Sequence, residues 1–111
     1  MEQKKICVIV KDNFIYYNKQ EKLIPDPDLT LTPHAPIVCL TCARGSDIAG
    51  GTAYMTFLCC PECMKALATA GIKKIVYKND KVFANNQEEK ELQAVIDYYE
   101  IETVKNEDIG I

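Results

Sequence analysis

The stretch 60-CPECMKALATAGIKKIVYKND-80 predicts a helix followed closely by a strand. Pro61 stands where helices accept proline, in the first turn, and Gly71 is the residue type that commonly ends a helix. Together they delimit a predicted helix over residues 61–71. The short run of residues 72–78, IKKIVYK, combines apolar and β-branched residues and predicts a strand directly after it.

The rest of the chain supplies further strand and helix signals. Residues 50–59 are rich in Thr, Tyr and Phe and predict a strand before the central helix. Apolar residues at helical spacing predict another helix over residues 87–100, with Leu92, Val95, Ile96 and Tyr99 on its inner side. The remaining predicted elements are strands at residues 6–10, 14–18 and 101–105 and a helix at residues 34–44. The order β-β-α-β-α-β-α-β predicts an α/β fold with a mixed sheet, right-handed crossovers and helices on both faces.

Size and composition narrow the class of protein. The 111 residues predict one domain, with 48% hydrophobic and 26% charged residues, which is a globular profile. The net charge of −3 argues against a nucleic-acid surface, which is usually basic. No signal peptide and no run of about 20 apolar residues is visible, so we expect a cytoplasmic protein. In that compartment, six cysteines indicate metal ligands, catalytic groups or buried side chains, and not a disulfide framework.

Two sets of residues compete as metal ligands. Cys39, Cys42, Cys60 and Cys63 have the spacing C-x2-C-x17-C-x2-C, which is typical of a structural zinc site with four cysteines. The alternative set is His34, Cys60 and Cys63. Three protein ligands leave the fourth position on zinc open for water, which is the arrangement of a catalytic site.

The predicted elements favour the His-Cys-Cys set. Cys60 and Cys63 stand where a strand ends and a helix begins, and the helix N-terminus lowers the pKa of thiols there. His34 begins another predicted helix, so two helix N-termini can converge at the carboxyl edge of the parallel strands. Cys39 and Cys42 fall inside that helix among apolar residues, and we interpret them as buried small side chains.

These residues resemble the zinc-dependent cytidine and deoxycytidylate deaminase superfamily. Its signature is His-x-Glu, then a strand, then Pro-Cys-x-x-Cys at the start of a helix. In this chain HAP at residues 34–36 and CCPEC at residues 59–63 occupy the two places. The run at residues 60–80 is similar to the deoxycytidylate deaminase branch in particular, and the similarity covers about residues 31–105.

The resemblance implies a fold, a cofactor and a reaction. The fold would be the three-layer α/β/α cytidine deaminase-like fold with a sheet of about five strands. Zn²⁺ would be held by His34, Cys60 and Cys63, and the reaction would be hydrolytic deamination of a cytosine nucleotide or nucleoside, with a dCMP-like substrate favoured. Members of the superfamily commonly form homo-oligomers, and Tyr98 and Tyr99 on the last helix are candidate contact residues.

The resemblance also implies substrate contacts. The backbone N–H of Ala35 would meet the pyrimidine carbonyl, and the backbone of Leu58 and Cys59 would meet the exocyclic amine. Asn18 would contact the sugar. The thiol of Cys59, next to a metal ligand, is expected to line the site.

Pro36 departs from the family's pattern at the position that matters most for catalysis. The family's glutamate, two residues after the histidine, moves protons between water, ring and leaving amine, and such general acid–base catalysis is worth about 10²- to 10⁴-fold. Proline has no ionisable group, but in the first turn of a helix its missing N–H costs little. Of the nearby acids, Glu62, Asp26 and Asp28 are interpreted as exposed groups rather than substitutes.

Three functions therefore remain open. The first is a zinc-dependent deaminase that is inactive or severely impaired because of Pro36. The second is a non-catalytic, zinc-stabilised module that binds a nucleotide or a protein partner. The third is a structural four-cysteine zinc module. The sequence leaves undecided whether Pro36 is natural or engineered, and whether the substrate is dCMP, cytidine or another amine.

Overall fold

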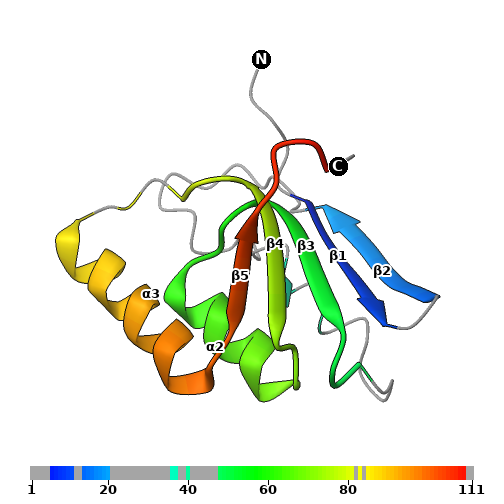
Figure 1. Ribbon diagram of the computed structural model, residues 1–111, viewed down its shortest axis with the longest axis horizontal. Helices are drawn as coiled ribbons and strands as arrows, with labels where there is room; N and C mark the ends of the chain where they lie inside the picture. The colour runs from blue at the N-terminus through cyan, green and yellow to red at the C-terminus, as the bar shows by residue number, and fades with distance from the viewer. Residues whose placement is uncertain are drawn as a thin grey trace, which may run out of the picture.

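The sheet is the centre of the fold in the computed structural model, which describes residues 6–11, 14–20, 36, 37, 40, 48–81, 83 and 85–109, with the backbone alone for 14–20. Five strands in this part of the chain form one sheet in the order β2-β1-β3-β4-β5 (Figure 1). The elements are β1 (Ile6–Lys11), β2 (Phe14–Gln20), β3 (Thr52–Phe57), α2 (Pro61–Thr69), β4 (Lys74–Asn79), α3 (Asn86–Tyr99) and β5 (Glu102–Lys105).

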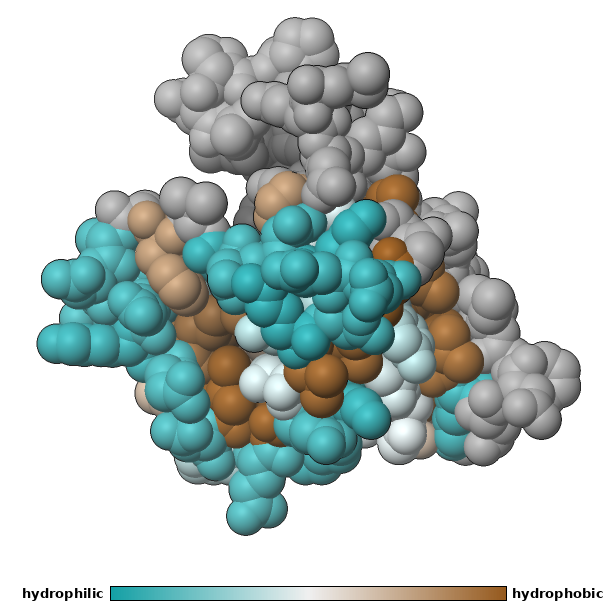
Figure 2. Space-filling model, turned by 45° about the horizontal axis from the view of Figure 1, so that its top comes forward, coloured by the Kyte–Doolittle hydropathy of each residue, from teal (hydrophilic) through white to brown (hydrophobic). Residues whose placement is uncertain are grey.

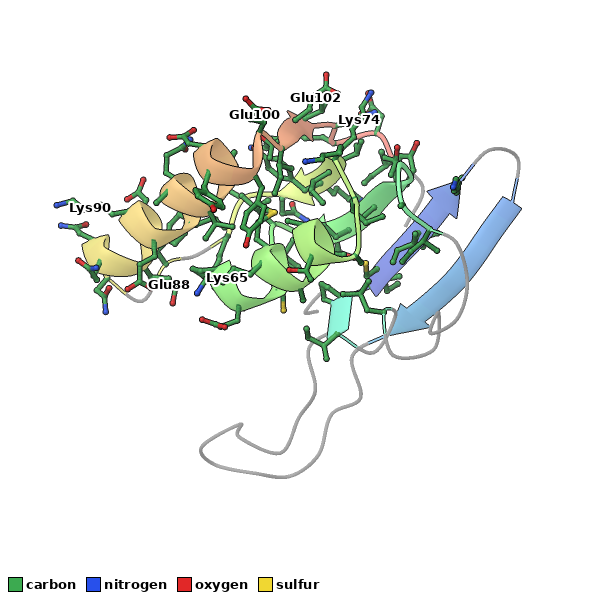
Figure 3. All side chains as sticks on the ribbon, turned by 90° about the horizontal axis from the view of Figure 1, so that it is seen from below. Lys65, Lys74, Glu88, Lys90, Glu100 and Glu102 are labelled. Carbon is green, nitrogen blue, oxygen red and sulfur yellow. The ribbon has the colours of Figure 1, made fainter. Side chains whose placement is uncertain are left out.

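The strand directions confirm the predicted mixed sheet. β1 pairs antiparallel with both β2 and β3, while β3, β4 and β5 are parallel. At the start of β4 and β5, the ammonium of Lys74 lies 3.8 Å from the carboxylate of Glu102 (Figure 3). The predicted opening hairpin and the parallel second half are therefore both correct.

Helices α2 and α3 lie on the same face of the sheet (Figures 1 and 3). Each connects a strand to its next parallel neighbour in the same direction, and right-handed crossovers in one direction bring both helices to one face. We expected helices on both faces; the described residues place α2 and α3 on one of them, and the helix predicted over residues 34–44 is described only at Pro36, Ile37 and Leu40.

Local signals place the helix ends close to where the sequence predicts them. Helix α2 begins at Pro61 and is followed by Gly71 with a φ of 95°, a conformation that glycine adopts readily. Helix α3 is capped by Asn85, whose side-chain oxygen accepts a 2.9 Å hydrogen bond from the backbone N–H of Glu88. It ends at Glu100, which has a left-handed φ of 55°.

The hydrophobic core lies between the sheet and these helices. Cys7 and Ile9 of β1 and Ala53 and Met55 of β3 point toward the helices, as alternation along a strand requires. The core consists of Cys7, Ile9, Ile48, Ala53, Met55, Cys59, Cys63, Met64, Leu67, Ala68, Ile72, Ile75, Leu92, Val95 and Ile101.

Helix α3 covers the core with one side only. Leu92 and Val95 are buried, and Ile96 and Tyr99 are partly buried against the core, which confirms the predicted spacing. Its outer side is hydrophilic, as Figure 2 shows at the left of the view. None of the helices in the described ranges is long and apolar enough to cross a membrane.

A tight contact joins the loop before β3 to the loop after α2. The backbone N–H of Gly50 donates a 2.8 Å hydrogen bond to the carbonyl of Gly71. A Cβ atom added at Gly71 would lie 2.6 Å from the Cβ of Ala49, whereas one added at Gly50 would meet nothing within 4 Å. Both glycines have positive φ, so their comparison isolates the effect of the contact.

Gly71→Ala should destabilise the fold more than Gly50→Ala. Both substitutions carry the backbone penalty of a positive φ, about 1–2 kcal/mol. Only Gly71→Ala adds an overpacked contact, typically about 1–3 kcal/mol. Urea unfolding measures both variants, and equal losses in the free energy of unfolding would contradict the close packing of these two loops.

Candidate metal centre

The junction between β3 and α2 carries the CPEC motif. Strand β3 ends at Phe57, and helix α2 begins at Pro61 after a short connection. Cys60 is the N-cap residue of α2, with an extended backbone, and its side chain accepts no capping hydrogen bond from the helix N–H groups. Its carbonyl accepts a 3.0 Å bond from the N–H of Met64, which begins the helix ladder.

The two cysteines of the motif lie within the first turn of α2. Cys63 is buried, with 1% of its surface exposed, and Cys60 is partly buried. Peptide dipoles at a helix N-terminus stabilise negative charge, so this position favours thiolates. Two soft sulfur donors one turn apart suit zinc by their chemistry. The predicted location of the pair at a strand end and helix start is confirmed.

The third predicted ligand, His34, lies outside the described residues, as do Ala35, Cys39 and Cys42. In the described part of the chain, no three His, Cys, Asp or Glu side chains gather as a metal site. The structure therefore describes Cys60 and Cys63, the two residues that both predicted ligand sets share.

Cys59 has a different character from its neighbour Cys60. Burial and, to a smaller extent, the negative charge of Cys60 raise the pKa of its thiol to about 12, although the ammonium of Lys81 acts in the opposite direction. Its thiol is therefore neutral near pH 7, and a neutral thiol is a poor metal ligand.

Pro36 is buried and helical. Ile37 and Leu40 are helical as well, and both are partly buried against the core. These three residues agree with the predicted helix over residues 34–44, whose other residues lie outside the described ranges. Proline in this helix is thus accommodated at a buried position.

Glu62 is an exposed side chain of α2. Its side chain is 82% exposed and pairs with Lys65 of the same helix, with 3.2 Å between carboxylate oxygen and ammonium nitrogen. This confirms the prediction that Glu62 points to solvent. Asp26 and Asp28 lie outside the described residues.

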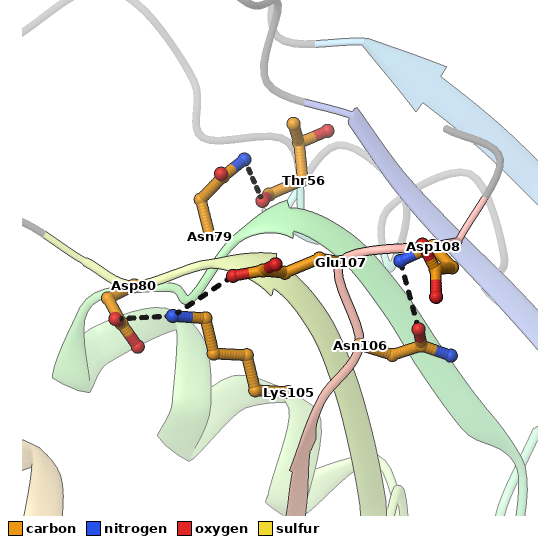
Figure 4. Close-up of polar contacts among 7 residues, drawn as sticks. All are labelled: Thr56, Asn79, Asp80, Lys105, Asn106, Glu107 and Asp108. Carbon is orange, nitrogen blue, oxygen red and sulfur yellow. Dashed lines mark hydrogen bonds and ion pairs between the residues drawn. The ribbon is translucent and has the colours of Figure 1, made fainter.

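Asn79 holds the end of β3 against the end of β4. Its side-chain amide donates a 3.1 Å hydrogen bond to the carbonyl of Thr56 (Figure 4), and its carbonyl accepts a 3.0 Å bond from the N–H of Leu58. The hydroxyl oxygen of Thr56 accepts a 3.1 Å bond from the N–H of Ile6 in β1. Sequence reasoning missed Asn79, since an asparagine after a strand usually indicates only a turn.

Leu58 and Cys59, the predicted contacts to the substrate amine, lie in this connection beside Cys60. Leu58 is partly buried and Cys59 is buried. Asn18, the predicted sugar contact, lies in β2, where its backbone pairs with Val8, and its side chain is outside the described atoms.

A second group of charges lies where β4 and β5 end. The ammonium of Lys105 donates a 2.8 Å hydrogen bond to Asp80 and lies 3.8 Å from the carboxylate of Glu107 (Figure 4). The hydrogen bond to Asp80 raises the pKa of Lys105 above its ordinary value. All three side chains are largely exposed, so these pairs add little stability.

The fold and the cysteine pair agree with the outcome of comparisons with known proteins. Residues 2–79 match the family model of the cytidine and deoxycytidylate deaminase zinc-binding region. The chain therefore belongs to this family, which confirms the resemblance drawn from the sequence.

Two phage enzymes are similar over a short region. The deoxycytidylate deaminases of Enterobacteria phages T2 and T4 are each 56% identical over 34 residues, which is 31% of this chain. The match spans only 18% of the length of each relative.

Solved structures confirm the fold over most of the chain. The dCMP deaminase of cyanophage S-TIM5 in complex with dCMP and dUMP has a TM-score of 0.74 at 22% identity, covering 96% of this chain and 83% of that one. A diaminohydroxyphosphoribosylaminopyrimidine deaminase/reductase from Thermotoga maritima has a TM-score of 0.72 at 22% identity, covering 91% of this chain and 29% of that one. These likenesses show the cytidine deaminase fold.

Proposed function

We propose that this chain is a zinc-dependent hydrolytic deaminase domain for cytosine nucleotides, with a dCMP-like substrate, whose turnover is blocked or severely impaired by Pro36. The observation that carries the proposal is the CPEC pair at the junction of β3 and α2 in a chain that belongs to the deaminase family. The names of the phage relatives and of the S-TIM5 structure support dCMP as the substrate class.

The proposed ligands of the metal are His34, Cys60 and Cys63. A zinc ion held by three protein ligands supplies Lewis-acid activation of water for hydrolysis. The part that the chain itself plays is to present two thiolates from the first turn of α2 and to keep Cys59 neutral beside them. The cytosine ring would be held by the backbone of Ala35, Leu58 and Cys59, and the sugar by Asn18.

Pro36 removes the proton-transfer group and leaves the helix intact. Because it has neither an ionisable group nor an N–H, it can hold no proton at the reacting amine. Its burial within a helix supports the view that the fold tolerates this residue. The same observation favours the second candidate function, a zinc-stabilised module that binds a nucleotide or a protein without turnover.

The remaining proposals concern the setting of the domain. We place it in the cytoplasm as a single domain, residues 1–111, that forms a homo-oligomer. Tyr98 is 80% exposed at the end of α3, and its ring meets that of Tyr99 edge to face at 4.8 Å. An exposed aromatic residue supported by a second one is a suitable contact for another copy.

Zinc content separates the two ligand sets. His34→Ala, Cys60→Ala and Cys63→Ala should each lose stoichiometric zinc after gel filtration, measured by mass spectrometry of the metal. Cys39→Ala and Cys42→Ala are the matched controls and should retain it. Loss of zinc from Cys39→Ala together with retention in His34→Ala would instead establish the four-cysteine module.

Pro36→Glu tests whether one residue blocks turnover. The variant should deaminate dCMP at least about 10²-fold faster than the chain as given, because it regains general acid–base catalysis. Ammonia release should be followed with dCMP, deoxycytidine, cytidine and guanine. Pro36→Gln is the matched control, similar in size without an ionisable group. A zinc-loaded Pro36→Glu variant that gains nothing on any substrate would favour the binding module.

A further inference from the structure

We propose that Asn79 is a positioning residue that orients the Cys60–Cys63 pair by fixing the end of β3. The inference rests on the proposed function, because it assumes that these two cysteines bind the metal. Asn79 is on β4, not on the motif itself, and acts on the motif through the backbone of residues 56–58.

Asn79 contacts the backbone at the end of β3 on both sides of a single residue, Phe57. Phe57 is opposite Asn79 in the parallel register, and Asn79 makes contacts on either side of it. Its amide nitrogen is 3.1 Å from the carbonyl oxygen of Thr56, and its own carbonyl oxygen is 3.0 Å from the backbone nitrogen of Leu58. The last peptide groups of β3 are thus held to β4 by the side chain and the backbone of the same residue.

Only one residue separates Leu58 from Cys60, the first cysteine of the motif. Leu58 is held, Cys59 follows, and Cys60 is already the N-cap of α2. Because each residue spans at most about 3.3–3.6 Å, the position of the Cys60 sulfur follows closely from the position of Leu58. At its other end the motif is fixed by α2, whose Met64 and Leu67 are fully buried in the core.

At the start of α2, no side-chain cap adds to the hydrogen bonds that Asn79 makes with the end of β3. The sulfur of Cys60 makes no capping hydrogen bond, so the turn into the helix is set by the backbone and by its neighbours. Thr56 connects these contacts to β1, because its hydroxyl oxygen accepts a hydrogen bond from the backbone N–H of Ile6. Three adjacent strands therefore meet through Thr56 and Asn79 at the edge that precedes the cysteines.

The role requires an amide. Asparagine reaches the Thr56 carbonyl with an N–H donor, whereas aspartate of the same shape would place a carboxylate oxygen against the carbonyl oxygen. Groups that orient metal ligands typically change metal affinity about 10- to 100-fold when they are removed. Since Asn79 acts through the backbone, we expect the lower end of this range.

The experiment compares Asn79→Asp and Asn79→Ala with Asn85→Ala. Asn85 also makes one short side-chain hydrogen bond, 2.9 Å to the N–H of Glu88, but it caps α3 and not α2. Zinc affinity is measured by competition with a chromogenic chelator, and ligand geometry by the visible absorption of the Co²⁺-substituted chain. Both Asn79 variants should bind zinc about tenfold more weakly and shift the Co²⁺ bands. Asn85→Ala should lower thermal stability but leave both the zinc affinity and the Co²⁺ absorption bands unchanged.

Two outcomes would overturn the inference. One is zinc affinity within twofold of the chain as given, with an unchanged Co²⁺ spectrum, in both Asn79 variants. The other is a loss of zinc affinity in Asn85→Ala as large as in the Asn79 variants, which would show that any loss of fold stability weakens zinc binding. If the chain as given binds no zinc, the proposed function fails instead. Amide hydrogen exchange of Leu58 in the metal-free chain then tests the positioning role. Exchange at Leu58 should be faster in Asn79→Ala, and unchanged exchange would contradict the role.

Discussion

The right-handed crossover from β3 through α2 to β4 is the constraint on which the rest of the structure depends. It brings the first turn of α2 to the carboxyl edge of two parallel strands, and it buries Met64 and Leu67 of α2 against the sheet. Cys60 and Cys63 are therefore held from one side by the core and from the other by the edge of the sheet. The same geometry repeated from β4 to β5 brings α3 beside α2.

The candidate site and the fold are coupled through hydrogen bonds that polar side chains and the backbone make, rather than through charges. The charged pairs near the edge, such as Lys105 with Asp80, are exposed and add little stability. By contrast, the hydrogen bonds among Ile6, Thr56, Asn79 and Leu58 join β1, β3 and β4 directly before Cys60 and Cys63.

The features that sequence reasoning predicted well are those with local causes. Pro61 and Gly71 delimit α2 through their own backbone restrictions, and Leu92 and Val95 follow the period of a helix. The strand order β2-β1-β3-β4-β5 depends on pairings between distant residues, such as Cys7 with Met55, which no local pattern encodes. Asn79 was missed for the same reason, since its partner Thr56 belongs to another strand. Both crossovers run in one direction, which accounts for α2 and α3 lying on one face.

The central claim is that zinc binds to one histidine and two cysteines with one position left open. X-ray absorption at the zinc edge of the loaded chain tests it most directly, because sulfur and nitrogen ligands are distinguished by number and distance. A site of one histidine and two cysteines should show two sulfur ligands at about 2.3 Å and a further shell of nitrogen and oxygen at about 2.0–2.2 Å. Four sulfur ligands at about 2.3 Å with no shorter shell would contradict it and establish the four-cysteine site instead.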